Sequence, residues 1–180
     1  MTGAAEKVYA NALFELSVES DSVEKIYGEL GFLSDVFNDN PKLSKILSVP
    51  TVTGDEKQKL ILDIFGEKLS ELSFNFLNVL VLHGKIMFIS RIYLEYKSRY
   101  YSRKGIIEIK ATTAVKLKKT LRDKLIKKLE SISSKTVILV EEIDASIIGG
   151  IVLSYGNTQI DSSIKSRIDS MRKQINSIIA

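Results

Sequence analysis

The sequence predicts a mainly α-helical protein in which an N-terminal six-helix bundle is followed by a small α/β C-terminal domain. Up to about residue 103, apolar residues recur at spacings of three and four, as on one face of a helix. After Gly105 the pattern changes to β-branched, partly alternating segments. A length of 180 residues leaves room for two small domains. We therefore expect one domain over residues 1–105 and a second over residues 106–180.

Six helices are expected before Gly105. Their ranges are Ala5 to Val18, Ser22 to Phe37, Pro41 to Ser48, Gly54 to Phe65, Ser70 to His83 and Phe88 to Arg103. Asn40 is expected to cap the third helix, with Pro41 at its first position. Thr53 and Glu56 have the spacing of a capping box for the fourth. The fifth helix is apolar nearly all round, so it must be covered on more than one side.

The C-terminal domain is expected to alternate strands and helices. The strands are Ile106 to Thr113, Thr136 to Ile143, Ile151 to Tyr155 and Gln159-Ile160. A helix from Lys116 to Ile132 would present one row of leucines, namely Leu117, Leu121, Leu125 and Leu129. Gly156-Asn157 is typical of a hairpin turn, and Asp161 is expected to cap the last helix. The apolar stripe of that helix is Ile164, Ile168, Met171, Ile175 and Ile178.

Composition excludes several classes of protein. The chain has no cysteine, which favours a reducing, cytoplasmic compartment. Its start lacks the apolar core of a secretion signal, and no apolar run approaches the roughly 20 residues that cross a bilayer, so we expect no direct membrane insertion. The net charge of +4 is uneven, with an acidic opening and a basic stretch from Arg91 to Lys128. Such asymmetry is typical either of two partner surfaces or of ordinary solvated helix faces.

Residues that could support catalysis are scarce. His83 is the sole histidine, and its place at the end of the most apolar helix favours a capping or core role. Gly149, Gly150 and Gly156 do not have the spacing of a phosphate-binding loop, and close backbone approach explains them better. Strand alternation sends the side chains of Glu141 and Glu142 to opposite faces. We expect no catalytic, cofactor-binding or metal-binding residues, and no cofactor.

A second reading is a small basic nucleic-acid-binding regulator. Lysines and arginines surround the leucine row of the Lys116 to Ile132 helix. Basic and aromatic side chains also alternate irregularly between Arg91 and Lys104, as in proteins that bind single-stranded nucleic acid. Tyr93, Tyr96 and Tyr100 share one helical face, however, so core packing accounts for them better.

The quoted residues combine into a pattern that resembles the delta subunit of the F-type ATP synthase, called the oligomycin-sensitivity-conferring protein (OSCP) in mitochondria. The resemblance covers nearly the whole chain. Its pieces are Tyr9-Ala10-x-Ala12-Leu13, Asn40-Pro41 with Leu47 and Pro50, Asn75-Phe76-Leu77 with Gly84, Asp144-x-x-x-Ile148-Gly149-Gly150, Gly156 and Ile160-Asp161-x-Ser163-Ile164. Lys85 stands where the family usually has Arg, Ser162 where Gly is common, and Thr113-Ala114 lacks the proline that often follows.

The resemblance implies a non-catalytic stator subunit, a monomer within a hetero-oligomeric complex that couples ATP synthesis to proton transport. In that family the first and fifth helices hold the N-terminal helix of an alpha subunit of the catalytic head, and the C-terminal domain binds the b subunits of the peripheral stalk. The groove residues implied here are Tyr9, Ala12, Leu13, Leu16, Phe76, Leu77 and Leu80. The C-terminal signature is Asp144, Gly149, Gly150, Gly156, Asp161 and Ser163. The implied location is peripheral, on the cytoplasmic face of a bacterial inner membrane, with no nucleic acid as partner.

Overall fold

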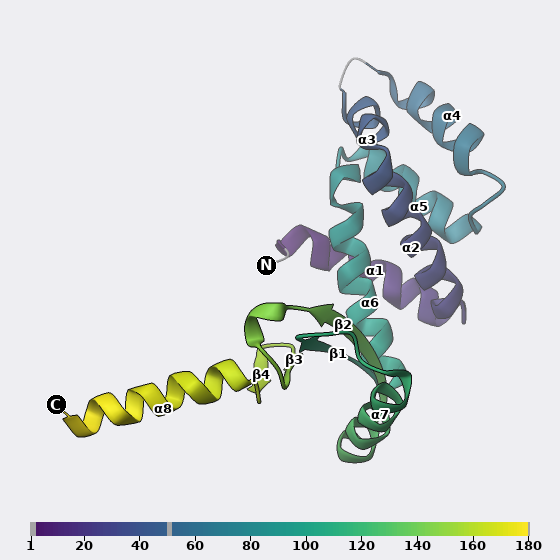
Figure 1. The fold of residues 1–180 in the computed structure, drawn as a ribbon. Helices are drawn as coiled ribbons and strands as arrows, with labels where there is room; N and C mark the ends of the chain where they lie inside the picture. The colour runs from purple at the N-terminus through teal and green to yellow at the C-terminus, as the bar shows by residue number, and fades with distance from the viewer. Residues whose placement is uncertain (1–2, 50–51, 180) are drawn as a thin grey trace. The chain divides into compact units, whose positions relative to one another are not determined.

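The computed structural model describes residues 3–49 and 52–179, and only the backbone of residues 175–179 (Figure 1). Pro50, one piece of the resemblance, and the side chains of Ile175 and Ile178 lie outside the described residues. The chain divides into two compact units, Met1–Tyr101 and Ser102–Ala180, which we call the helical unit and the sheet unit. Within the described residues there are eight α-helices and one four-stranded sheet, which confirms the predicted fold class.

The helical unit is built from six α-helices whose ends lie within two residues of the predicted ones. They are α1 (Ala4–Glu19), α2 (Val23–Asp39), α3 (Pro41–Ser48), α4 (Gly54–Phe65), α5 (Glu71–Leu82) and α6 (Ile89–Lys104), with a 3-10 turn, Ile86–Phe88, before α6. α2 contacts α1, α3 and α5, and α4 packs beside α5 (Figure 1). The last residues of α6 continue into the sheet unit.

Two of the predicted helix caps have different outcomes. The capping box of α4 is confirmed, because Thr53 Oγ1 accepts from the Glu56 N–H at 3.4 Å and Glu56 Oε2 accepts from the Thr53 N–H at 3.0 Å. Asn40 precedes α3 as predicted, but its side chain makes no capping bond there. Its Nδ2 instead donates to the carbonyl of Val36 at 2.9 Å, so this amide satisfies the end of α2.

The core of the helical unit is centred on α6. Tyr96 is fully buried, its hydroxyl lies 2.7 Å from Ser17 Oγ, and it donates to the Val23 carbonyl at 3.2 Å. Tyr100 is 8% exposed, and its ring stacks on that of Tyr27 with centroids 4.4 Å apart. Tyr96 and Tyr100 are therefore core residues, as predicted, whereas Tyr93 on the same helical face is half-buried.

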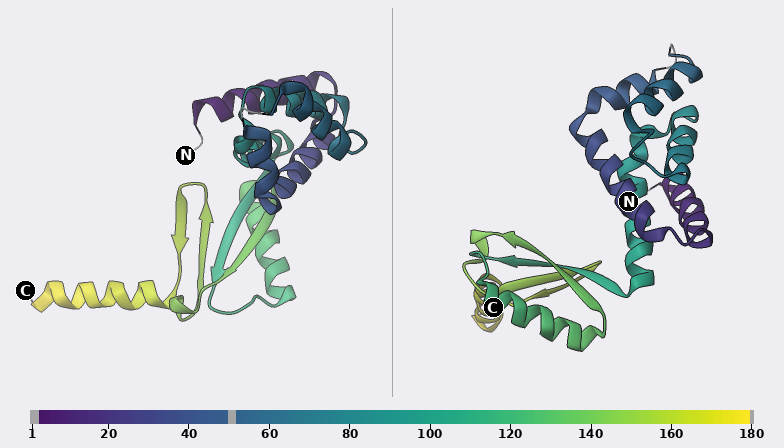
Figure 2. Two further views of the ribbon diagram at one scale, coloured as in Figure 1. Left: turned by 90° about the horizontal axis from the view of Figure 1, so that it is seen from above. Right: turned by 90° about the vertical axis from the view of Figure 1, so that its right-hand side faces the viewer.

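The sheet unit has strand order β2-β1-β3-β4. The strands are β1 (Ile106–Thr113), β2 (Thr136–Ile143), β3 (Ile151–Tyr155) and β4 (Thr158–Asp161). β1 and β2 run parallel and are joined by α7 (Lys119–Ser133), the crossover helix that a parallel pair needs, whereas β3 is antiparallel to β1 and β4. α7 covers one face of the sheet (Figure 2), where Leu125, Ile126 and Leu129 pack on a strand cluster. That cluster is Ile107, Ile109, Ala111, Val137 and Leu139.

The start of α7 differs from the prediction. The helix begins at Lys119, three residues later than expected, because the Thr113 hydroxyl donates to the Val115 carbonyl and Lys118 is still extended. Leu121 is therefore on the open side and 54% exposed. Leu117 packs against the sheet from the segment before the helix, so the predicted row of four leucines is not one helical row.

The junction between β4 and α8 (Ile164–Ile179) also differs from the prediction. Asp161 belongs to β4, and its carboxylate accepts from the Ser163 N–H at 2.8 Å rather than from the helix. Ser163 Oγ accepts from the Ser166 N–H at 3.1 Å and is the side chain that caps α8. The predicted cap was wrong by two residues because Asp161 is held in the β3–β4 hairpin.

Candidate functional site

Helices α1 and α5 are joined through one tyrosine. The Tyr9 hydroxyl lies 2.9 Å from Nδ1 of His83, and its ring meets that of Phe76 edge to face at a centroid distance of 6.4 Å. His83 is the C-cap residue of α5 and is exposed, so the predicted capping role is confirmed and burial is not. These contacts connect α1 to α5 between residues 74 apart in the sequence.

The N-terminus of α1 is fixed independently. Glu6 is 4% exposed and its carboxylate lies 3.4 Å from Arg91 on α6. The pKa of Glu6 is lowered, first because its own backbone N–H donates to the carboxylate, and further by Arg91 and the N–H of Gly3. The carboxylate thus stabilises the first turn of the helix, whose free N–H groups favour negative charge.

The seven predicted groove residues fall into two sets. Leu13, Leu77 and Leu80 are at most 1% exposed and belong to the core. The other four, which are Tyr9, Ala12, Leu16 and Phe76, are exposed or half-buried. The three buried leucines can support a binding surface from below, and the four exposed or half-buried residues can contact a partner.

The predicted set of groove residues omits two exposed apolar residues of these helices, Val8 and Val79, which are 65% and 40% exposed. A helical spacing of four along each helix, continuing from Ala12 and from Asn75, would have located them. We use the name α1–α5 surface for Tyr9, Ala12, Leu16, Phe76 and Val79. It is an apolar strip carried by two helices whose mutual position is fixed.

Buried polar atoms without partners also gather on α1 and α5. Within the described chain, Asn11 Oδ1, Ser73 Oγ and Asn78 Oδ1 are buried and accept no hydrogen bond from protein. Such atoms lower the stability of the free protein unless water reaches them. Their concentration on the two helices marks this part of the bundle as less than optimally satisfied.

The acidic residues of the C-terminal signature act as local caps. Asp144 Oδ1 accepts from the Ser146 N–H at 2.8 Å and closes the 3-10 turn Ala145–Ile147, as Asp161 does for Ser163. The pKa of each aspartate is lowered mainly by hydrogen bonds from the serine it caps. These carboxylates are therefore held ionised by structural bonds.

The glycines of the signature permit backbone conformations that other residues resist. Gly150 has φ +83, and a Cβ there would collide with the carbonyl oxygen of Ser162. Gly149 approaches Ile164 so closely that a Cβ would lie 2.9 Å from its Cδ1. Gly156 has φ +56 in the β3–β4 turn. The signature therefore builds the root of α8.

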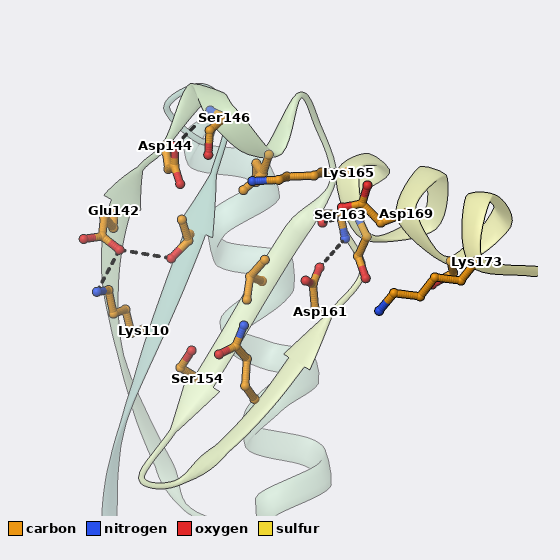
Figure 3. A pocket seen from close by; sticks show the side chains of 16 residues that line it. Lys110, Glu142, Asp144, Ser146, Ser154, Asp161, Ser163, Lys165, Asp169 and Lys173 are labelled. Atoms are coloured by element: carbon orange, nitrogen blue, oxygen red, sulfur yellow. Dashed lines mark hydrogen bonds and ion pairs between the residues drawn. The ribbon is translucent and has the colours of Figure 1, made fainter. Parts of the chain in front are cut away.

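A polar cavity of about 520 Å³ lies over the sheet face opposite α7 (Figure 3). Glu142 bonds Lys110 at 2.7 Å and accepts from the Thr112 hydroxyl at 3.2 Å, and these partners lower its pKa. Glu141 faces the other way and bonds Arg122 of α7 at 2.9 Å, which confirms the predicted alternation. The carboxylates of Glu142, Asp144 and Asp161 thus already serve structural bonds rather than an activated nucleophile or base.

The described residues form neither a metal site nor a membrane-spanning helix. Across residues 3–49 and 52–179, no group of three His, Asp or Glu is placed to hold a metal ion. In the same ranges no helix is both long and apolar enough to span a bilayer.

The fold and its surfaces define a two-unit protein, a helical bundle with an apolar strip on two helices joined to a small α/β unit with an exposed terminal helix. The model of one family, described as ATP synthase delta (OSCP) subunit, matches residues 5–175. The ATP synthase subunit delta of Alkaliphilus oremlandii is 32% identical over 99% of both chains, and that of Alkaliphilus metalliredigens is 34% identical over 99% of both. The chain belongs to the ATP synthase delta (OSCP) subunit family.

A solved structure supports the fold at larger evolutionary distance. A chain of the Toxoplasma gondii mitochondrial ATP synthase hexamer superimposes with a TM-score of 0.75 and 21% identity, over 96% of this chain and 98% of that one. The nucleic-acid alternative finds no support, because the family and the relatives are ATP synthase subunits and because Tyr96 and Tyr100, two of the tyrosines that would stack on bases, are buried.

Proposed function

We propose that the chain is a non-catalytic stator subunit that holds the catalytic head through its helical unit and the peripheral stalk through its sheet unit. Family membership makes it a component of an ATP synthase, where a stator keeps the head from turning with the rotor. In this proposal the α1–α5 surface binds the N-terminal helix of an alpha subunit, and the sheet unit binds b subunits. The complex lies at the cytoplasmic face of a bacterial inner membrane, and proton flow drives its rotor.

The observation that carries the proposal is the α1–α5 surface itself. Tyr9 is half-buried and Leu16 and Val79 are exposed, so they offer apolar area to solvent on two helices, and an amphipathic helix covers such area with residues three and four apart. Tyr9 joins the helices before any partner arrives, through His83 and Phe76. The surface is thus preformed.

The free energy gained from apolar contacts on the α1–α5 surface is similar in size to the free energy lost on association. About five apolar contacts at about 1.5–3 kcal/mol each give roughly 8–15 kcal/mol before costs. Association costs about 4–15 kcal/mol in lost freedom. One apolar strip holds a partner tightly only if little further ordering is needed, and a second contact through the sheet unit adds affinity by raising the effective concentration.

The test uses the full chain and a synthetic peptide that copies the N-terminal segment of the alpha subunit from the same complex. Leu16→Asp and Val79→Asp place a charge in the contact and should each weaken peptide binding at least about tenfold, measured by fluorescence anisotropy. Leu94→Asp is the matched control, because Leu94 is a 56% exposed leucine on α6 and should leave the affinity within about twofold. Unchanged binding in both surface variants would exclude the α1–α5 surface as the site.

Binding of the sheet unit to the stalk is measured in a separate experiment. A soluble fragment of the b subunits should be retained by the immobilised full chain and by Leu16→Asp alike. If neither the alpha peptide nor the b fragment is retained, the stator proposal fails.

A further inference from the structure

The last helix, α8, presents its apolar residues to solvent and its polar residues to its own unit. Ile164, Ile168 and Met171 are 44%, 39% and 60% exposed. Ser166, Asp169 and Lys173, from the opposite side of the helix, line the polar cavity over the sheet (Figure 3). A helix that belonged to the core of this unit would have the reverse orientation.

The N-terminus of α8 is held by hydrogen bonds to the sheet unit. The Ile164 N–H donates to the Gly149 carbonyl at 3.0 Å, and Ser163 caps the first turn. Gly149 and Gly150 permit the close approach that brings the strand and the helix together. The outward direction of the stripe is therefore fixed by the same residues that form the family's signature.

The spacing of the stripe identifies the kind of surface it fits. Ile164, Ile168 and Met171 are separated by four and three residues, and Ile175 and Ile178 continue this alternation in the sequence. A strict repeat of 3.5 residues is the seam of a coiled coil and is narrower than the face of a helix buried in a globular core. The stripe therefore matches another helix with a similar repeat.

The charged residues beside the apolar seam of α8 indicate which kind of partner helix it fits. In the heptad that places Ile168 at position a and Met171 at position d, Arg172 occupies e and Arg167 occupies g. These positions face the partner and set its identity. Lys165, at e of the preceding heptad, lines the polar cavity over its own sheet instead (Figure 3). Two copies of α8 would bring like charges together, whereas a partner with Asp or Glu beside its seam would pair with them.

The charge of the whole unit favours the same partner. Residues 102–180 contain fifteen Lys and Arg against eight Asp and Glu, a net charge of +7, whereas residues 1–101 have eleven against fourteen, a net charge of −3. An anionic membrane would also be attracted, but membrane-surface helices usually add Trp or Phe to a wide apolar face. The sequence of α8 has no aromatic residue.

We propose that α8 forms a short heterotypic coiled coil with a helix whose seam is flanked by Asp and Glu; this rests on the proposed function, in which that helix belongs to the stalk. The 16 residues of α8 span about 24 Å, or roughly two heptads. Such a contact is weak by itself and gains strength from the simultaneous attachment of the helical unit to the head.

The experiment titrates the full chain with a synthetic four-heptad peptide that has Ile and Leu in its seam and Glu at both flanking positions. Met171→Asp should weaken binding at least about tenfold, because it places a charge in the seam. Ser170→Asp is the matched control, since it adds the same charge one residue away on the polar side of α8 and should stay within about twofold. Circular dichroism of both variants checks that the helix remains folded.

Two further probes identify the partner class. A peptide with the same seam and Lys at the flanking positions should bind at least about tenfold more weakly, and raising the salt should narrow that difference. Vesicles of phosphatidylglycerol and phosphatidylcholine should show no binding that depends on Met171. The proposal is overturned if Met171→Asp and Ser170→Asp bind the acidic peptide equally, if the Lys peptide binds equally well, or if vesicles compete with the peptide.

A soluble b fragment separates this inference from the function on which it rests. Retention of the b fragment by wild type and by Met171→Asp alike would leave the stator function standing and refute the coiled coil. Binding of the acidic peptide without retention of the b fragment would have the opposite meaning, because the seam would be real and the stalk would not be its partner.

Discussion

The Tyr9 hydroxyl lies 2.9 Å from Nδ1 of His83, so the middle of the first helix is bonded to the end of the fifth. The bond is exposed, and the ring contact with Phe76 lies beside it. The surface proposed to hold the head therefore includes a hydrogen bond that can be deleted by removing a single oxygen atom.

Tyr9→Phe removes that link while keeping the ring. The free energy of unfolding should fall by about 0.5–1.5 kcal/mol, the net value of one hydrogen bond. Urea unfolding of the full chain measures it, with Tyr155→Phe, an exposed tyrosine of the sheet unit, as control. A loss as large as that of a core truncation would mean that the ring contact has been disturbed as well.

Ser73→Ala should stabilise the protein or leave it unchanged. Ser73 is fully buried, and its Oγ has no hydrogen-bond partner within the described residues. Removing an unsatisfied hydroxyl should raise the free energy of unfolding by up to about 1 kcal/mol. Denaturant titration measures the change, and a clear loss of stability would indicate that a water molecule satisfies the hydroxyl.

Gly150→Ala should destabilise the sheet unit more than Gly156→Ala. Both glycines have positive φ, but a Cβ at Gly156 meets open space, whereas at Gly150 it meets the Ser162 carbonyl. The conformational penalty alone is about 1–2 kcal/mol for each, and the collision adds to it at Gly150 alone. Hydrogen exchange of the amides of β3 and α8 reports the difference, and equal protection in the two variants would contradict it.

Alkaline pH should weaken the helical unit through Tyr96. Burial raises the pKa of this phenol, partly offset by the hydrogen bond to Ser17. Because the folded-state pKa is the higher one, the stabilisation from the neutral phenol is complete below the unfolded value of about 10 and is lost as the pH rises through the folded value. The melting temperature above pH 10 should fall less steeply in Tyr96→Phe than in wild type.

Acid should loosen the root of α8. Hydrogen bonds from Ser163 lower the pKa of Asp161, so its stabilisation is present above the unfolded pKa and is lost as the pH falls through the folded value. Asp161→Asn should therefore lower the melting temperature of the sheet unit at neutral pH and flatten its dependence on pH in the acid range. A parallel shift with unchanged slope would show that another carboxylate is responsible.

Helix and strand positions could be predicted from the sequence because the spacing of apolar residues changes at the same places where glycines and capping residues occur. Gly105 has φ +65 and ends α6 where the apolar spacing changes, and the capping box at Thr53 marks the start of α4. Pairing could not be read, because β1 lies parallel to β2 and antiparallel to β3, and nothing local in Ile106–Thr113 specifies either partner.

The candidate site was only partly predictable for a similar reason. Apolar spacing identifies α1 and α5 as helices, but Leu13 and Leu16 look alike in sequence, and only packing shows that the first is in the core and the second is 49% exposed. Asp161 was predicted to cap α8, but Ser163 does so, since either side chain can cap a helix and the hairpin decides which one is in position.

The junction between α6 and β1 has a mechanical consequence. α6 ends at Lys104 and β1 begins at Ile106, so a single residue, Gly105, separates a helix from the sheet that follows. If head and stalk are held as proposed, any tension between them is carried by this one stretch of backbone. A hydrogen-bonded helix is stiff along its axis, and Gly105 is held on both sides, because its N–H donates to the Ser102 carbonyl at 3.4 Å and its carbonyl accepts from the Thr136 N–H at 3.0 Å. Under that proposal, a pull arriving along α6 would pass through Gly105 into the paired strands β1 and β2.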